Sequence, residues 1–157
     1  MQKITPFLWF DTQAEEAANF YTSIFKNSRI VDVMRNGEAS PAGAAGSVLT
    51  VSFELEGQAF TALNGGPMFN FTPAISLFVS CESQAEVDEL WDKLLAGGGE
   101  PEQCGWLKDR YGVSWQVIPT VLLDYLQDED PGKAKRAMDA MLGMQKIDIP
   151  ALEAARA

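Results

Sequence analysis

The side chains best suited to chemistry gather in one short stretch, from Cys104 to Gln116. Asp109 and Tyr111 offer a carboxyl group and a phenol for proton transfer, and Cys104 offers a thiol. The chain has no histidine, which excludes Ser-His and Cys-His catalysis, imidazole metal ligands and histidine general bases. Acid–base chemistry in this protein would therefore need a carboxyl or thiol group with a shifted pKa.

Gln116 belongs to the run 106–119, WLKDRYGVSWQVIP, which predicts a strand, a tight turn at Asp109–Gly112 and a second strand. Side chains alternate along a strand, so Gln116 faces away from Trp115 and Val117. A single inward-facing glutamine among apolar neighbours is typical of a ligand pocket. It is equally typical of a core amide whose hydrogen bonds are satisfied, and the residues alone leave both interpretations open.

Cys104 also has two interpretations. A reactive cysteine needs a base or a positive charge nearby, and Lys108 and Arg110 are close in sequence. Strand geometry can point those two side chains away, and free cysteine is among the most buried residue types. The sequence therefore favours a small buried thiol at Cys104. We expect it and Cys81, the second of the two cysteines, to stay reduced.

The elements that must position these residues form a repeated pattern. Strands are predicted at Ile4–Phe10, Arg29–Met34, Val48–Leu55, Gln58–Leu63, Ala74–Val79, Trp106–Lys108 and Val113–Pro119. Thr12 with Glu15 matches a capping box that begins a helix, and Ser83 with Glu86 matches a second one. Shifting the numbering by 71 carries Thr12 onto Ser83 and Phe7 onto Phe78. The chain therefore predicts two copies of strand–helix–strand–strand–strand that build one sheet.

A helical tail follows the two copies. Asp130 and Pro131 predict the start of one of its helices. An apolar tail after a complete fold packs on its own domain or on a partner chain, and we expect a role in dimer packing. The prediction is one α+β domain over 1–157, with module one at 1–66, module two at 67–120 and the tail at 121–157.

Charge and composition limit the partners. The net charge is −10 and 46% of the residues are hydrophobic, which indicates a globular chain and disfavours nucleic acid and anionic membranes. No apolar run approaches the roughly 20 residues that a membrane span needs. The first residues, MQKITPFLWFD, do not match a signal peptide. We therefore expect a cytoplasmic protein with no nucleic-acid or membrane partner.

Four motifs carry a resemblance to a known family: ITPFLWFD with EAANFY, the turn ALNGGP, the run CGWLKDRYGVSWQVIP, and DPGKAKRAMDAMLGMQKIDIPAL. Together they span nearly the whole chain. The chain resembles the vicinal oxygen chelate superfamily (the glyoxalase, bleomycin-resistance and extradiol dioxygenase fold). Within it, the chain is similar to the PhnB-like group, labelled 3-demethylubiquinone-9 3-methyltransferase domain. The resemblance implies paired βαβββ modules, a cupped mixed sheet that encloses a pocket, and a homodimer.

The resemblance also implies where a metal would be held. In metal-dependent members, histidine or glutamate occupies four strand positions that face the cup. Here those positions correspond to Thr5 or Pro6, Thr61, Ala74 and Gln116. Hydroxyl, methyl and amide groups do not replace imidazole and carboxylate as ligands of a divalent transition metal. We therefore expect a cup without a metal or another cofactor.

The chain also lacks the loop that a Rossmann-type methyltransferase needs. That loop is rich in glycine, follows a first parallel strand and opens a helix. Gly97-Gly98-Gly99 instead follows a predicted helix, so it is interpreted as the end of that helix.

Three hypotheses about function follow. The first is a dimeric, metal-free cup that binds a small, partly apolar molecule without covalent chemistry, through Trp9, Thr61, Asn64, Trp106 and Gln116. The second is an enzyme of the superfamily that performs acid–base chemistry on a small metabolite, for which Asp109, Cys104 and Tyr111 are the nearby candidates. The third is an interaction protein whose dimer surface is its function. Inward polar groups around a pocket would favour the first two, and a cup filled by its own side chains would favour the third.

Overall fold

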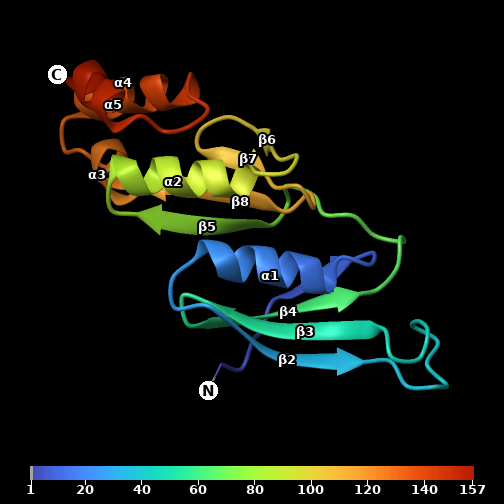
Figure 1. Ribbon diagram of the computed structural model, residues 1–157. Coiled ribbons are helices and arrows are strands. Elements are labelled where there is room, and N and C mark those ends of the chain that lie inside the picture. The colour runs from blue at the N-terminus through green and yellow to red at the C-terminus, as the bar shows by residue number, and fades with distance from the viewer. Residues whose placement is uncertain (1) are drawn as a thin grey trace. The chain divides into compact units, whose positions relative to one another are not determined.

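The computed structural model describes residues 2–157, which form two compact units, residues 2–71 and residues 72–157 (Figure 1). Each unit holds one four-stranded sheet and one helix of the predicted repeat, and the second also holds the C-terminal helices. The α+β class and the two βαβββ copies are confirmed. The expected single sheet is wrong, because hydrogen bonds join the described strands into two four-stranded sheets, one from each copy. Residues 67–71 group with the first unit and the tail groups with the second.

The first unit follows the predicted order of elements. They are β1 (Phe7–Phe10), α1 (Ala14–Ile24), β2 (Arg29–Arg35), β3 (Val48–Leu55) and β4 (Gln58–Asn64). The strand order is β1-β4-β3-β2, in which β1 runs parallel to β4 and the other pairs are antiparallel. Helix α1 packs on one face of this sheet: its Tyr21 is fully buried and stacks on Phe53, with ring centroids 6.3 Å apart.

The predicted capping box at Thr12 is wrong. Helix α1 begins at Ala14, and Gln13 flanks it without a side-chain cap. The Ala14 backbone N–H donates instead to Asn64 Oδ1 at the end of β4, over 2.8 Å. A residue distant in sequence therefore satisfies a helix donor that the local pattern assigns to Thr12.

The second unit repeats this topology with the order β5-β8-β7-β6, in which β5 runs parallel to β8. Its elements are β5 (Ser76–Cys81), α2 (Gln84–Leu95), β6 (Glu100–Pro101), β7 (Trp106–Lys108) and β8 (Ser114–Pro119). Here the capping box is confirmed, because Ser83 Oγ accepts from the Glu86 N–H. The Glu86 carboxylate closes the motif on the N–H of Glu82, one residue earlier than in the standard box.

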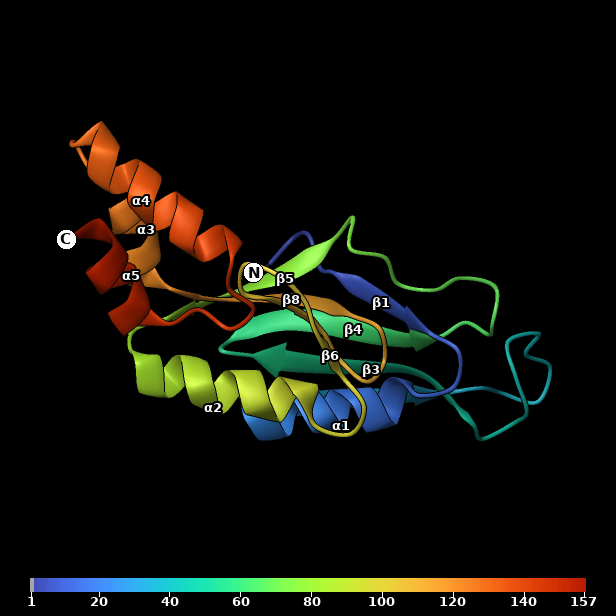
Figure 2. The ribbon, with the colours of Figure 1, turned by 90° about the horizontal axis from the view of Figure 1, so that it is seen from above.

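The tail forms three helices, α3 (Thr120–Leu126), α4 (Pro131–Leu142) and α5 (Ile149–Arg156). Figure 2 shows them gathered at one end of the strands of the second unit. Ile118, Leu122, Ile147 and Leu152 form their buried core. The Gln84 carboxamide ties the tail to α2, since its Nε2 donates to Ile147 O (2.9 Å) and its Oε1 accepts from Ile149 N (2.7 Å). The tail thus packs on its own unit, and its role in a dimer stays a prediction.

Within residues 2–157, none of the helices combines the length and the apolar character that crossing a membrane would require.

Candidate functional site

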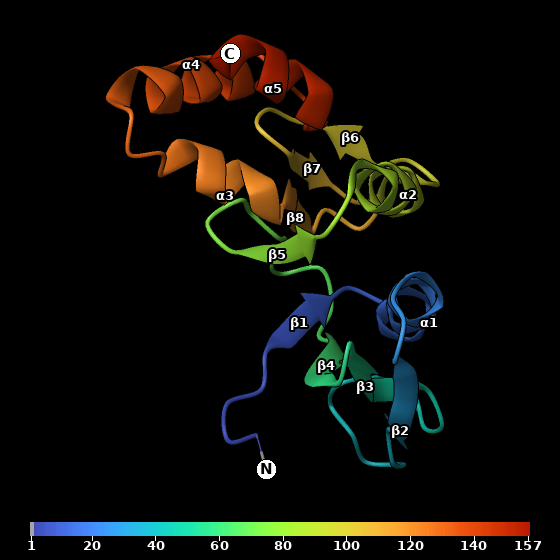
Figure 3. The same ribbon diagram turned by 90° about the vertical axis from the view of Figure 1, so that its left-hand side faces the viewer.

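The sheet of the second unit has two faces of different character. Leu107, Trp115 and Val117 are buried on the face that packs against α2. The opposite face, which we call the distal face, carries Ser76, Phe78, Ser80, Trp106, Lys108, Ser114, Gln116 and Ile118. Figure 3 shows α2 on one side of this sheet and α3 on the other. Gln116, which sequence analysis placed opposite Trp115 and Val117, therefore lies on a face that α2 does not cover.

Gln116 lies at the centre of the distal face. It pairs with Phe78 of β5 on one side and with Trp106 of β7 on the other. Gln116 Nε2 donates to Ser76 Oγ over 2.9 Å, while its carbonyl oxygen accepts no hydrogen bond from residues 2–157. Phe78 is 48% exposed, and Gln116 and Trp106 are half-buried. The amide is thus held in place by one contact and keeps an acceptor available between two aromatic rings.

A second row crosses the same strands beside Gln116. Ser76 pairs with Ser114, and Ser114 pairs with Lys108. Ser114 is only 1% exposed, yet its hydroxyl has no hydrogen-bond partner among the described residues. Lys108 pairs in turn with Glu100 on β6, but their charged groups form no ion pair in the part of the chain that the structure describes. A buried hydroxyl without a partner costs free energy, so this row offers a hydrogen bond that a ligand could complete.

The tail packs beside the aromatic residues Phe78 and Trp106, on the side away from Ser114. Ile118, two positions after Gln116 on the same face, is buried against Ile147 and Leu122. Gly105, which precedes Trp106, has φ +85°, and a Cβ there would lie 2.6 Å from Ile118 Cδ1. The Gly105 N–H donates to Gln145 O over 2.8 Å. The tail therefore packs directly against the residues that flank Trp106 and Gln116.

Asp109 does not lie on the distal face. The residue is 3% exposed, and its carboxylate accepts three hydrogen bonds, from the N–H groups of Tyr111 (2.8 Å) and Val113 (3.1 Å) and from Trp115 Nε1 (2.9 Å). These donors hold the turn and orient Trp115 on the α2 side of the sheet. The carboxylate of this predicted acid–base candidate is therefore used to stabilise the hairpin.

The other two acid–base candidates flank the site. Cys104 is half-buried and has φ +60°, and its N–H donates to Met144 O over 2.8 Å. Tyr111 is half-buried in the turn, with the Arg110 guanidinium carbon 5.8 Å from its ring centroid. Arg110 Nε donates to Ala96 O over 3.1 Å, so this cation is directed to the end of α2.

Two of the predicted binding residues lie together on the first sheet. Thr61 pairs with Phe7, the register position that matches Gln116 opposite Phe78. Thr61 and Trp9 both point away from α1, on the face opposite Leu8 and Ala62. The Trp9 indole N–H donates to Gly66 O over 3.0 Å, and Phe69 packs edge-on against its ring at 5.0 Å.

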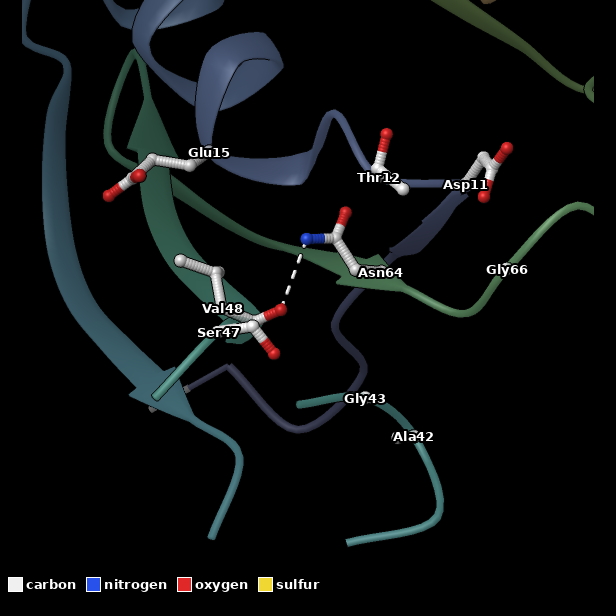
Figure 4. Close-up of a pocket in the computed structure, with 9 residues that line it drawn as sticks. All are labelled: Asp11, Thr12, Glu15, Ala42, Gly43, Ser47, Val48, Asn64 and Gly66. Atoms are coloured by element: carbon white, nitrogen blue, oxygen red, sulfur yellow. Dashed lines mark hydrogen bonds between the residues drawn. The ribbon is translucent and has the colours of Figure 1, made fainter. Parts of the chain in front are cut away.

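Asn64, the remaining predicted binding residue, lies on the α1 face instead. Besides accepting from Ala14, it donates from Nδ2 to Val48 O over 3.1 Å. It lines a cavity of about 370 Å³ in the first unit (Figure 4). The cavity is lined by Asp11, Thr12, Glu15, Ala42, Gly43, Ser47, Val48, Asn64 and Gly66. Figure 4 shows the Asp11 and Glu15 carboxylates at opposite sides of this cavity rather than together. Their two negative charges are therefore not concentrated at one point of the cavity.

The residues at the expected metal positions do not fit a metal. On the second sheet, Gln116 Nε2 donates to Ser76 Oγ, and Ala74 lies exposed before β5 begins. The register pairs Gln116 with Phe78, and the side chain that Gln116 contacts is the hydroxyl of Ser76. Across residues 2–157, no three His, Cys, Asp or Glu side chains come together as a ligand set. Neutral amide and hydroxyl groups are poor ligands for divalent transition metals.

Comparison with known proteins identifies the family. The 3-demethylubiquinone-9 3-methyltransferase family matches residues 2–118. The chain belongs to this family. A PhnB protein from Bacillus cereus, named for the same methyltransferase, is 44% identical over 76% of this chain and 100% of its own, with a TM-score of 0.68. None of the curated proteins matches the chain.

More distant structures share only the fold. The protein PA1353 from Pseudomonas aeruginosa is 22% identical over 76% of this chain and 98% of its own, with a TM-score of 0.62. The fosfomycin resistance protein FosX from Listeria monocytogenes, solved with Mn(II) and sulfate, is 15% identical over 81% and 98%, with a TM-score of 0.55. The PhnB-like chain therefore has the glyoxalase/bleomycin-resistance fold of the vicinal oxygen chelate superfamily.

The name of the family does not describe a Rossmann methyltransferase here. Each unit has a four-stranded mixed sheet rather than a doubly wound parallel one. Gly97 and Gly98 adopt positive φ values directly after α2, as expected for the end of a helix. The matched family region ends at residue 118, so helices α3 to α5 lie beyond it.

Sequence reasoning missed the contribution of Ser76 and Ser114 to this site. Strand alternation around Gln116 already places Ser114 on the Gln116 face, and that signal was available. The contact of Ser76 with Gln116 depends on the parallel pairing of β5 with β8, across 40 positions, and no local pattern indicates it.

Proposed function

We propose that this PhnB-like protein is a homodimeric binding protein that holds a small, partly apolar molecule on the distal face of its second sheet, without a metal and without covalent chemistry. The observation that carries the proposal is the Gln116 carboxamide. It is fixed by Ser76, flanked by Phe78 and Trp106, and keeps its carbonyl oxygen available. A few placed polar groups among aromatic side chains are typical of small-molecule sites.

The chemistry of the face favours binding over catalysis. A neutral amide with two hydroxyl neighbours orients a ligand through hydrogen bonds but transfers no proton at ordinary pH. Asp109, the carboxylate predicted for acid–base work, is buried on the other side of the sheet with three donors. We therefore keep the acid–base enzyme as the alternative, with no observation that favours it.

Exposed apolar side chains on the tail support the dimer. Leu123 on α3 is 43% exposed, and Met138 and Leu142 on α4 are 40% and 56% exposed. Met138 and Leu142 are four positions apart and so share one side of the helix. Burial of such a strip in a symmetric interface would remove apolar surface from water.

Native mass spectrometry of protein taken directly from cells tests the proposal. We expect the mass of a dimer that carries an organic molecule and no metal, and we expect denaturation to release that molecule. Gln116→Ala should reduce the retained molecule at least about tenfold, because the site loses its central hydrogen-bonding group. The matched control is Gln127→Ala, since Gln127 is exposed at the end of α3; it should retain the molecule.

Two results would overturn the proposal. One tightly bound transition-metal ion per chain would return the protein to the metal-dependent side of its superfamily. Purification without any retained molecule, together with equal behaviour of the two glutamine variants toward every compound of a metabolite library, would leave the distal face without a binding role.

A further inference from the structure

We infer that the distal face takes a flat ring that carries an anionic oxygen, such as an aromatic carboxylate. The inference rests on the proposed binding function and names the class of its ligand. Two rows of side chains across the strands carry it. One is the aromatic row, Phe78–Gln116–Trp106, and the other is the hydroxyl row, Ser76–Ser114–Lys108.

The aromatic row fits the ring. Two strand spacings, roughly 10 Å in all, separate the Phe78 and Trp106 backbones, with Gln116 between them. Aromatic pairs prefer offset or edge-to-face contacts, which a flat ring over Gln116 can make with both side chains. Phe78 is 48% exposed although it is large and apolar, so covering it with a ring would also remove apolar area from water.

The hydroxyl row fits the anionic oxygen. The Ser114 hydroxyl is buried and has no partner among the described residues. The Ser76 oxygen already accepts from Gln116, which leaves the Ser76 proton to be donated. Lys108 supplies the positive charge beside Ser114. An oxyanion here would receive two hydroxyl donors and an ammonium group, and hydrogen bonds to a charged acceptor are the stronger ones.

Glu100 limits how strongly this row attracts an anion. It lies across from Lys108 on β6, one strand further from Ser114. Because Glu100 and Lys108 form no ion pair in the described residues, the ammonium group stays available to a ligand. The carboxylate should still repel an anion moderately, which makes it a useful position for testing the charge of the ligand.

The tail fixes the direction in which the ligand lies. On the side of the aromatic row away from Ser114, Ile118 is buried against Leu122 and Ile147. That end is apolar and filled, while the Ser114 end is polar and has unmet hydrogen-bonding capacity. The ring therefore lies toward Ile118 and the charged oxygen toward Lys108.

Isothermal titration calorimetry of the intact protein with two matched probes tests the inference. The probes are 2-naphthoate and its uncharged relative 2-naphthamide. We expect 2-naphthoate to bind at least about tenfold more tightly, because it alone makes charge-assisted hydrogen bonds. Lys108→Met keeps the apolar stem but removes the charge, and it should abolish most of that preference without weakening 2-naphthamide.

Two further variants separate charge from structure. Glu100→Gln should tighten 2-naphthoate by roughly two- to threefold at low salt, because it removes a like charge. Ser114→Ala should weaken 2-naphthoate by roughly fivefold while leaving the urea midpoint of unfolding unchanged or raised, since it deletes a hydroxyl that has no partner in the folded state. A merely structural serine would instead lower that midpoint.

The outcomes distinguish the inference from the proposed function. Equal binding of the two probes, or no binding of either at millimolar concentration, overturns the anionic-ring class. If native mass spectrometry nevertheless finds a retained molecule that Gln116→Ala loses, the binding function stands and only the ligand class is wrong. If no molecule is retained either, both fail.

Discussion

In the first unit the residue opposite Phe7 is Thr61, and in the second unit the residue opposite Phe78 is Gln116. Both phenylalanines are exposed, at 63% and 48%, and both point away from the helix of their own unit. The repeat therefore preserves the backbone register and the exposed ring, while the polar residue beside the ring differs. The shared fold thus fixes where the polar residue lies, and the side chain at that position decides which hydrogen bonds it can offer beside the ring.

The hairpins of the two units are built by different means. In the first unit, Glu56 and Gly57 turn the chain through positive φ values of 50° and 80°. In the second unit, the longer turn is organised by the Asp109 carboxylate and its three donors. One hairpin thus depends on backbone conformation, whereas the other depends on one buried side chain.

Asp109→Ala should have the largest effect of the variants that compare the two units. It leaves two backbone N–H groups and an indole N–H without their acceptor, so we expect a loss of about 3 kcal/mol or more in the free energy of unfolding. Asp109→Asn should cost less, since one oxygen remains for the backbone donors. Urea unfolding followed by circular dichroism measures both.

The matched control lies in the other hairpin. Glu56→Ala removes an exposed side chain and should change the free energy of unfolding by less than about 0.5 kcal/mol. If Glu56→Ala and Asp109→Ala proved equally mild, the contrast between a backbone-built and a side-chain-built hairpin would be wrong.

The starts of α1 and α2 give the second contrast. Asn64 should matter more than either capping residue that the sequence suggests, because it both caps α1 and binds Val48 O. We expect Asn64→Ala to cost roughly 1–2 kcal/mol, Ser83→Ala about 1 kcal/mol, and Thr12→Ala close to nothing. The same unfolding measurement checks this ranking. A cost at Thr12 as large as that at Ser83 would restore the local capping box and contradict the long-range cap.

Local patterns of sequence predicted much of this fold. The bounds of Val48–Leu55 and Trp106–Lys108 are reproduced by the structure, because alternation and turn residues act over a few positions. The capping box at Ser83 succeeded for the same reason. The box at Thr12 failed because Asn64, 50 positions away, supplies the acceptor. Pairing between distant strands decides such contacts, and a single sequence does not display it.

The residues of the candidate site also separate into those that local sequence patterns indicate and those that depend on pairing between distant strands. Gln116 was predicted as a binding residue from strand alternation and Trp106 as a pocket residue, and the structure places them opposite each other. Trp9 and Thr61 share a face of the first sheet, whereas Asn64 lies on the α1 face. Whether these five side chains bind a ligand stays a prediction. Ser76 entered the site only through the pairing of β5 with β8.

Cys81 in the second unit and Phe10 in the first differ in residue type but occupy matching buried positions, so this comparison predicts the smallest effect. Cys81 holds the register position that Phe10 holds in the first unit, and both are buried. Burial, followed by the negative charge of Glu86, raises the pKa of the Cys81 thiol from 9.0 to about 12. We therefore expect iodoacetamide at pH about 8 to leave Cys81 unmodified in the folded protein, because the thiolate is the nucleophile. Half-buried Cys104 should react first, as mass spectrometry of the digested protein would show.

The same shift predicts how stability depends on pH. Above pH 9.0 the unfolded chain loses the thiol proton, while the folded chain keeps it up to about pH 12. The folded state then binds more protons than the unfolded state, so this group lowers stability as the pH rises through that window. Cys81→Ala removes the effect, and the free energy of unfolding of the variant should fall less steeply between pH about 8 and about 10.5 than that of the natural protein. Parallel slopes would show that Cys81 ionises in the folded state as readily as in the unfolded one, and that the thiol is not enclosed as Phe10 is.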